Sequence, residues 1–317
     1  MQRERLVPLL EWARREGISE SLARKWIKEG RLQAVRLGHY WYVPEVVDGP
    51  ERETKTYTLF THAGGAGKTS LARDLGFELA SRGYRVLLVD ADPQANLTAW
   101  LGVEADRGRT LLHLVRSGEL PEPVEVRPRY HLIPADISLA LAEIELAQKP
   151  LGEVLLRGGL SALEGRYDFV LVDSLPSLGK LAVMAALAGD GLILPVEATP
   201  KGLQAAATVL ALAEEYLASL KRLDSRAHGL RRFTALVVPT KFDPRTSTGK
   251  LALEALAQVA AGLPVSPPLS LRPGVYGRAT DGRVPVHEAG SEEAVREVRA
   301  VAEAFLRAVG AEEVVRG

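Results

Sequence analysis

Short, almost wholly apolar runs alternate along the chain with longer stretches in which apolar residues recur every three to four positions. The short runs are typical of strands, and they lie at 56–62, 85–92, 130–136, 167–174, 191–198 and 233–242. Strands that are apolar on both faces belong to a parallel sheet with helices on each side. The pattern therefore predicts an α/β fold with a doubly wound, mainly parallel sheet.

The last helical stretch has a start signal and an inner face. Ser291 is a candidate N-cap, and Glu292 and Glu293 suit the positive end of a helix dipole. The expected inner face consists of Val295, Val298, Ala302, Phe305 and Val309. Because the polar face carries charges of both signs, we expect this helix to pack on the sheet rather than on a membrane.

The first fifty residues form a separate pattern. Two short amphipathic helices are expected, the first ending at Gly17 and the second running from the cap Ser19 to Gly30. Their inward residues are Leu9, Trp12 and Ala13 in the first helix and Leu22, Trp26 and Ile27 in the second. An alternating stretch around Gly38 and His39 then predicts a hairpin, which gives the order of a winged helix-turn-helix.

A charged run, DGPERETK at 48–55, has no apolar period and contains Gly and Pro. Such a run contributes little to a core, so it predicts a boundary between two domains. We expect a small domain at 1–50, a linker at 51–55 and the sheet domain at 56–317.

Composition narrows the chemistry. The 317 residues include 40 Lys and Arg against 40 Asp and Glu, so any nucleic-acid surface must be a local patch. The absence of cysteine excludes disulfides, thiolate zinc sites and cysteine-held iron–sulfur clusters. No apolar run approaches the ~18 residues that a membrane span needs, and the start lacks a secretory pattern. We expect a cytoplasmic protein without a membrane partner.

The segment HAGGAGKTS at 62–70 has the composition of a phosphate-binding loop, although His62 stands where the usual pattern has glycine. A strand-like run precedes it and a helical pattern follows, as such a loop requires. We expect Lys68 to contact the terminal phosphates and Thr69 to bind Mg²⁺. The expected nucleotide-binding residues are Gly64, Gly65, Ala66, Gly67, Lys68, Thr69 and Ser70.

Three carboxylates are expected beside this loop. Asp90 and Asp92 end the run at 85–92, and Asp173 ends the run at 167–174. Because the carboxyl ends of parallel strands meet at the ligand crevice, these side chains would face Mg²⁺ and its waters. Each of them alone could instead cap a helix.

Four segments together resemble the ParA group of deviant-Walker ATPases, which includes Soj: HAGGAGKTS, VLLVDADPQANLT, YDFVLVDSLPSLGKLAVMAAL and VVPTKFDPRTSTG. The resemblance, over about residues 56–309, implies Lys68, Asp92 and Asp173 as catalytic residues, with Asp92 placing the attacking water. It implies Thr69, Asp92 and Asp173 around Mg²⁺. It also implies an ATP-joined homodimer that binds DNA without sequence preference, a nucleoid-associated location and a ParB-like centromere-binding partner that stimulates hydrolysis.

One family residue is missing. The signature lysine, which reaches the partner subunit's nucleotide, falls on Ala63. An alanine supplies no charge to the developing phosphate, so we expect ATP binding to persist and hydrolysis to be slow or to rely on another group. A protonated His62 is one alternative, but a histidine with local hydrogen bonds at the strand end is the favoured interpretation.

Residues 1–50 resemble the excisionase and MerR type of winged helix-turn-helix, whose second helix enters the major groove. Between Ser19 and Val43, five basic residues stand against two acidic ones. The expected DNA contacts are Ser21, Arg24, Lys25, Lys28 and Arg36. A protein-interaction module with a solvated basic face is the alternative. One such unit reads half a site, so specificity implies a dimer.

Further basic residues surround the last predicted strand: Arg222, Arg226, Arg231, Arg232, Lys241, Arg245 and Lys250. Basic residues in the C-terminal half of ParA relatives bind DNA nonspecifically, so Arg245 and Lys250 are candidate contacts, with a solvated face as the alternative. The segment 269–286 resembles the family's stretch near the nucleotide base, with Arg272 as its candidate.

The sequence thus predicts an ATP-dependent DNA-partition ATPase with its own site-reading N-terminal module. The alternative is an ATP-sensing transcription regulator with little or no turnover. Ala63 favours the regulator, whereas Asp92 favours the enzyme.

Overall fold

The computed structural model describes residues 2–37, 40–48, 53–106 and 109–311. The chain divides into two compact units, residues 1–52 and 53–317. Each unit has its own sheet and its own apolar core. No helix in the described part of the chain is long and apolar enough to cross a bilayer.

The larger unit is built on a seven-stranded sheet with the order β10-β9-β4-β8-β5-β7-β6. Its strands are β4 (Lys55–Leu59), β5 (Val86–Ala91), β6 (Val124–Arg127), β7 (Tyr130–Ile133), β8 (Phe169–Ser174), β9 (Gly191–Glu197) and β10 (Thr234–Thr240). Every neighbouring pair is parallel except β6 and β7. All six predicted strands are confirmed, and β6 was missed because this short edge strand is only partly buried and has no apolar run.

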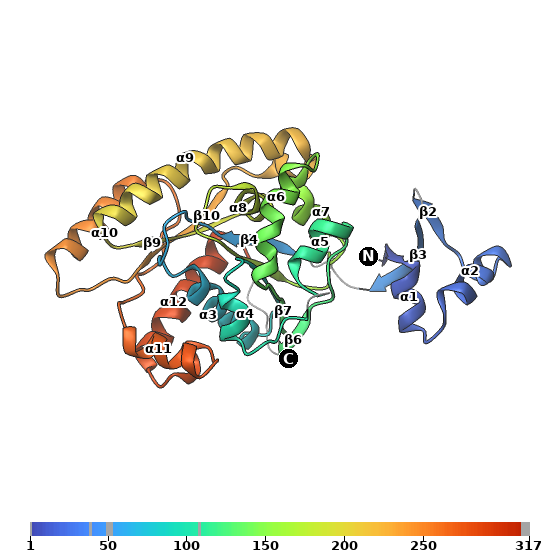
Figure 1. Cartoon of the computed structure of the whole chain (residues 1–317), viewed down its shortest axis with the longest axis horizontal. Helices are drawn as coiled ribbons and strands as arrows, with labels where there is room; N and C mark the ends of the chain where they lie inside the picture. The colour runs from blue at the N-terminus through green and yellow to red at the C-terminus, as the bar shows by residue number, and fades with distance from the viewer. Residues whose placement is uncertain (1, 38–39, 49–52, 107–108, 312–317) are drawn as a thin grey trace. The chain divides into compact units, whose positions relative to one another are not determined.

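Helices cover both faces of this sheet (Figure 1). They are α3 (Lys68–Ser81), α4 (Asn96–Trp100), α5 (Leu111–Ser117), α6 (Leu141–Ala147), α7 (Leu155–Ser161), α8 (Lys180–Ala186), α9 (Pro200–Leu223), α10 (Ser247–Val259), α11 (Pro273–Asp281) and α12 (Glu292–Ala308). Alternate residues of one strand point to opposite faces, so Leu88 joins the core under α3 and α12 while Leu87 joins the core under α5 to α8. The doubly wound fold is therefore confirmed.

Helix α12 packs on the sheet as expected. The Ser291 side chain accepts a hydrogen bond from the Ala294 amide and caps the helix. Val298, Ala302 and Phe305 are fully buried. The Phe305 ring lies edge-on to Tyr57 of β4 and to Phe169 of β8, which fixes the helix against the centre of the sheet.

The smaller unit contains β1 (Gln2–Pro8), α1 (Leu9–Arg15), α2 (Glu20–Lys28), β2 (Val35–Leu37) and β3 (Tyr40–Asp48), with the sheet order β1-β3-β2. Ser19 caps α2 by accepting from the Leu22 amide. The buried core is Leu9, Ala13, Ala23 and Val43.

One expectation for this part of the chain is wrong. Leu22 is 37% exposed, and Ala23 takes the inward place on α2, because a nine-residue helix against a small sheet buries only a narrow stripe. The division between the two units falls inside the charged run at 48–55, where Asp48 ends β3 and Lys55 begins β4. The predicted hairpin tip at Gly38 and His39 lies outside the described residues.

Candidate nucleotide site

A glycine loop joins β4 to α3 at the carboxyl edge of the sheet. Gly65 has φ 74° and Gly67 has φ 89°, a left-handed backbone that glycine adopts without strain. Gly67 is the N-cap of α3 and leaves the first turn without a side-chain cap. The amide groups of that turn can therefore receive an anion, as in known phosphate-binding loops.

Strand β10 holds this loop from the side. The Thr240 hydroxyl, which is buried, donates to the carbonyl of Ala66 at 2.9 Å. The Thr240 carbonyl in turn accepts from the Ala198 amide at the end of β9. Because both strands belong to the sheet, the loop is positioned by the sheet rather than by its own sequence alone.

Lys68 begins α3 and folds back over the loop. It is 6% exposed, and its ammonium donates to the carbonyls of Thr61 at 3.1 Å and Ala63 at 3.3 Å. Burial lowers the pKa of Lys68, while the charges of Asp173 and Asp92 oppose that shift. A phosphate is a stronger partner for this ammonium than two neutral carbonyls, so Lys68 is positioned for an anionic ligand.

The predicted carboxylates do come together at the same edge. Asp90 and Asp173 are directly opposite each other in the parallel pair of β5 and β8. Asp90 is fully buried and accepts from the Thr98 hydroxyl at 2.7 Å and the Thr98 amide at 2.9 Å. Burial raises the pKa of Asp90 to about 6, against these hydrogen bonds. Asp90 therefore orders the turn that carries Asp92.

Asp173 is the unexplained member of this group. It is 1% exposed, and neither of its carboxylate oxygens has a hydrogen-bond partner among the described residues. Burial, followed by the Asp90 charge, raises the pKa of Asp173 well above its ordinary range, while the nearby Thr69 hydroxyl and the Lys68 charge oppose that shift. Buried polar atoms almost always have a partner, so a cation or its bound water is the group that would satisfy this carboxylate.

These residues fit Mg²⁺ bound through a nucleotide rather than a preformed metal cage. Among the described residues, no three His, Asp or Glu side chains are close enough to hold a metal ion by themselves. Mg²⁺ usually keeps several waters and takes one or two protein ligands together with substrate phosphates. Thr69 at the start of α3, with Asp92 and Asp173 nearby, matches that pattern.

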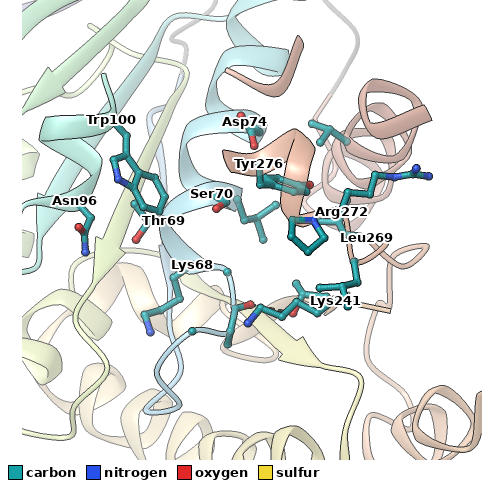
Figure 2. Close-up of a pocket in the computed structure, with 18 of the residues that line it drawn as sticks. Lys68, Thr69, Ser70, Asp74, Asn96, Trp100, Lys241, Leu269, Arg272 and Tyr276 are labelled. Carbon is teal, nitrogen blue, oxygen red and sulfur yellow. Dashed lines mark hydrogen bonds between the residues drawn. The ribbon is translucent and has the colours of Figure 1, made fainter. Parts of the chain in front are cut away.

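A cavity of about 520 Å³ opens beside the loop. Its walls are formed by the loop and first turn of α3, by β10's end and by the segment that leads into α11. Figure 2 shows Lys68, Thr69 and Ser70 on one wall, with Lys241, Arg272 and Tyr276 across from them. A cavity of this size suits a small organic ligand, on the range of about 300–1,000 Å³.

One end of the cavity is apolar. Leu269, Leu271, Pro273 and Tyr276 line it, and Trp100 and Asn96 lie on the side of α4. Arg272 is held by Glu297 of α12 at 3.0 Å, so its charge is already paired. The segment 269–286 was expected near a base, but Asn96, Trp100 and Tyr276 were not singled out, because no motif marks a residue that reaches a cavity through the fold.

His62 and Ala63 precede the glycines. The Nδ1 atom of His62 is buried without a hydrogen-bond partner in the described part of the chain. The Ala63 amide donates to the Thr61 hydroxyl at 3.3 Å, and its carbonyl accepts from Lys68. The backbone of Ala63 thus shapes the loop, while its side chain supplies no charge.

The candidate DNA contacts lie on both units. On α2, Ser21, Arg24, Lys25 and Lys28 are exposed. Arg24 pairs with Glu20 at 2.7 Å and Lys25 with Glu29 at 3.7 Å, which leaves Lys28 as the helix's unpaired cation among described residues. The side chain of Arg36 lies outside the described side chains.

In the larger unit, Arg245 is 86% exposed but pairs with Asp243 at 2.9 Å. Lys250 on α10 is exposed. Arg226 also has a carboxylate partner, Asp224. Lys241, grouped with these residues by sequence, lies instead in the wall of the cavity.

Comparisons with known proteins agree with this geometry. A family model described as an AAA domain matches residues 54–222. A Thermus thermophilus protein described as a probable plasmid-partitioning protein ParA is 51% identical over 318 residues, which cover 100% of this chain and 97% of that protein.

Two solved structures of nucleotide-bound proteins have a similar fold. The ATP complex of a Cyanothece McdA variant matches with a TM-score of 0.69 and 27% identity, over 83% of this chain and 99% of that chain. Cobyrinic acid a,c-diamide synthase from Mycobacterium smegmatis, with a bound ATP analogue and magnesium, matches with a TM-score of 0.63 and 25% identity, again over 83% and 99%.

Proposed function

Since the chain belongs to the ParA family of partition ATPases, we propose that its cavity binds ATP with Mg²⁺ and that hydrolysis times a DNA-partition cycle. The observation that carries this proposal is the combination of an uncapped glycine loop, Lys68 turned back over it, and the buried Asp173 beside it, whose carboxylate has no hydrogen-bond partner within the described residues. An anion and a cation are both needed to satisfy these groups, and Mg–ATP supplies both.

Each residue then has a distinct role. Lys68 exchanges the carbonyls of Thr61 and Ala63 for the terminal phosphates. The Thr69 hydroxyl and the Asp173 carboxylate would hold Mg²⁺, Asp173 through a metal-bound water. Asp92 orients the attacking water. Bound Mg²⁺ neutralises charge that develops on the transferred phosphate.

The proposed cycle is an assembly cycle. ATP joins two copies of the chain, the dimer binds DNA through a surface that includes Arg245 and Lys250, and a ParB-like centromere-binding protein stimulates hydrolysis. ATP promotes the dimer only as far as it binds the dimer more tightly than the monomer. Such a protein works in the cytoplasm on the nucleoid. The Thermus thermophilus relative, a probable plasmid-partitioning protein, supports this proposal.

Residues 1–50 are proposed to act as a winged helix-turn-helix that reads a DNA site. The support is the order of α1, α2 and the strand pair β2 and β3, together with exposed basic residues on α2. Arg24 is paired with Glu20, and Lys25 with the helix's C-cap Glu29. We therefore propose Lys28 as the phosphate contact of this helix.

A second candidate function is an ATP-sensing transcription regulator with little turnover. Ala63 favours it, because the loop lacks a second cation for the transferred phosphate. The intact Asp92 favours the enzyme.

Calorimetric titration with Mg–ATP tests the site. Lys68→Ala should abolish measurable binding, because the only cation of the loop is lost from beside the phosphates. Lys221→Ala, near the far end of α9, serves as the matched control and should bind as the unmodified protein does. Equal affinity of Lys68→Ala and the control would refute the assignment of the loop.

ATP turnover in the presence of nonspecific DNA and of the centromere-binding partner separates the enzyme from the regulator. The unmodified protein should release phosphate faster than Asp92→Ala, with ATP affinity similar in both. If turnover does not exceed that of Asp92→Ala under any of these conditions, the regulator is the correct function.

A further inference from the structure

Lys241 follows the last residue of β10 and has an unusual backbone. Its φ of 53° lies in the left-handed region, which residues other than glycine, asparagine and aspartate rarely adopt. The neighbours on both sides are fixed: Thr240 donates to the Ala66 carbonyl, and the Phe242 amide donates to the Leu269 carbonyl. A strained residue that is held by its surroundings is a candidate for a functional position.

The side chain of Lys241 extends from β10 toward the glycine loop (Figure 2). A side chain added at Gly65 would bring its Cβ to within 3.6 Å of the Lys241 ammonium. The ammonium therefore lies beside the glycine loop. Lys241 also lines the cavity, together with Leu269 and Leu271.

No carboxylate neutralises this ammonium among the described residues. The next acidic residue along the chain, Asp243, is paired with Arg245 at 2.9 Å. Arg272, the other cation in this wall, is paired with Glu297 at 3.0 Å. Lys241 is thus an unpaired positive charge at a loop whose own amides attract an anion, and residues 62–67 contribute no cation to that loop other than a protonated His62.

We propose that Lys241 is a nucleotide-binding residue that contacts the polyphosphate from within the same subunit, beside Gly65 of the loop. The inference rests on the proposed ATP site and deepens it, because it gives the site a second cation. Because its ammonium lies beside Gly65 of the loop, it would meet the phosphates rather than the base.

Nucleotide affinity, measured by calorimetry with the full chain and Mg²⁺, tests this inference. Lys241→Met keeps the stem and removes the charge, so it should weaken ATP binding about tenfold or more, the effect of one lost charge-assisted hydrogen bond. The affinity of this variant for ADP should fall by a similar or smaller factor, and its affinity for AMP should hardly change. Lys241→Arg should retain most of the affinity, and Lys221→Met should match the unmodified protein.

Lys241→Gly separates a ligand role from a structural role. Glycine adopts a left-handed backbone without strain, so the thermal midpoint of the ligand-free protein should stay the same or rise. ATP affinity should nevertheless fall at least as far as in Lys241→Met. A fall in both quantities would mean that Lys241 supports the fold, and would overturn the proposal.

Two other results would also overturn it. In the first, Lys241→Met binds ATP as tightly as the unmodified protein. In the second, its affinities for ATP and for AMP fall by the same factor. If the unmodified protein itself bound no ATP, the proposed function would fail together with this inference. If the unmodified protein binds and the Lys241 variants bind equally well, only the role of Lys241 fails.

Discussion

At the residue scale, the site depends on charges that the folded chain leaves unsatisfied. Asp173 is buried without a hydrogen-bond partner among described residues, and the Lys68 ammonium donates to two neutral backbone carbonyls. Burying such groups costs free energy unless a ligand or partner compensates. The many apolar contacts of the fold outweigh the cost of burying these two groups. Binding of Mg–ATP would give both groups strong partners and so remove that cost.

Ala63 stands where the resemblance to the ParA group implies a lysine. Ala63→Lys should raise the rate of ATP hydrolysis about tenfold or more, because it adds a cation that can approach the developing charge on the phosphate. The measurement is phosphate release with DNA present. Ala63→Met is the matched control, since it adds a stem of similar length without charge. Equal rates for the lysine and methionine variants would show that charge at this position has no part in hydrolysis.

At the scale of elements, two strands and one helix set the geometry of the site. The register of β5 against β8 places Asp90 beside Asp173, and β10 holds the loop through Thr240 and Ala66. Helix α9 contributes indirectly. Thr199 caps its first turn after β9, and Asp224 is its C-cap.

Asp224 joins three elements at the end of α9. It accepts from Arg157 of α7 at 2.7 Å and from Arg226 at 3.1 Å, and Arg157 is only 8% exposed. Burial favours a higher pKa for Asp224, but the hydrogen bonds from Arg226 and Arg157 outweigh it and hold the pKa below its ordinary 3.8. The folded state therefore prefers the ionised carboxylate.

Asp224→Asn should lower the free energy of unfolding at pH 7 by about 2 kcal/mol, because the buried Arg157 loses a charged hydrogen-bond partner. A depressed pKa stabilises the fold fully above the unfolded value of 3.8 and progressively less below it. The difference between the variant and the unmodified protein should therefore shrink as the pH falls below 3.8.

Denaturant unfolding at pH 7 and at pH 3 checks this prediction. Asp281→Asn, an exposed aspartate at the end of α11, is the control and should change stability little at either pH. A difference for Asp224→Asn that stays constant between the two pH values would contradict an ionic origin.

At the scale of the whole molecule, the chain combines a nucleotide-binding unit with a small basic unit. Because the 40 basic and 40 acidic residues balance, attraction to DNA must come from local surfaces such as that of α2. We propose that residues 1–50 recognise a specific DNA sequence and that the larger unit binds DNA without sequence preference.

Deletion of residues 1–50 should remove sequence preference while leaving a salt-sensitive background affinity for DNA. In the full chain, Lys28→Ala should weaken binding to specific and nonspecific DNA by similar factors and reduce the salt dependence, as expected for a phosphate contact. Binding curves at several salt concentrations measure both effects. Sequence preference that persists after the deletion would place site reading in the larger unit.

Much of the fold followed from patterns that are local in the sequence. Six strands were predicted because buried parallel strands are continuous apolar runs, and α12 because its cap and inner face repeat at helical spacing. Strand β6 and the inward place of Ala23 did not follow, because an exposed edge strand and a short helix on a small sheet lack a strong periodic signal.

The sequence alone determined the glycine loop, Lys68, Thr69 and the strand-end carboxylates, because their chemistry depends on residue type at fixed spacing. It also determined that Ala63 carries no charge. Only the tertiary structure decided that Asp173 lacks a partner, that Arg272 is paired with Glu297, and that Lys241 faces Gly65. These facts depend on contacts between segments far apart in the chain, and no local pattern encodes which partner a side chain meets across the fold.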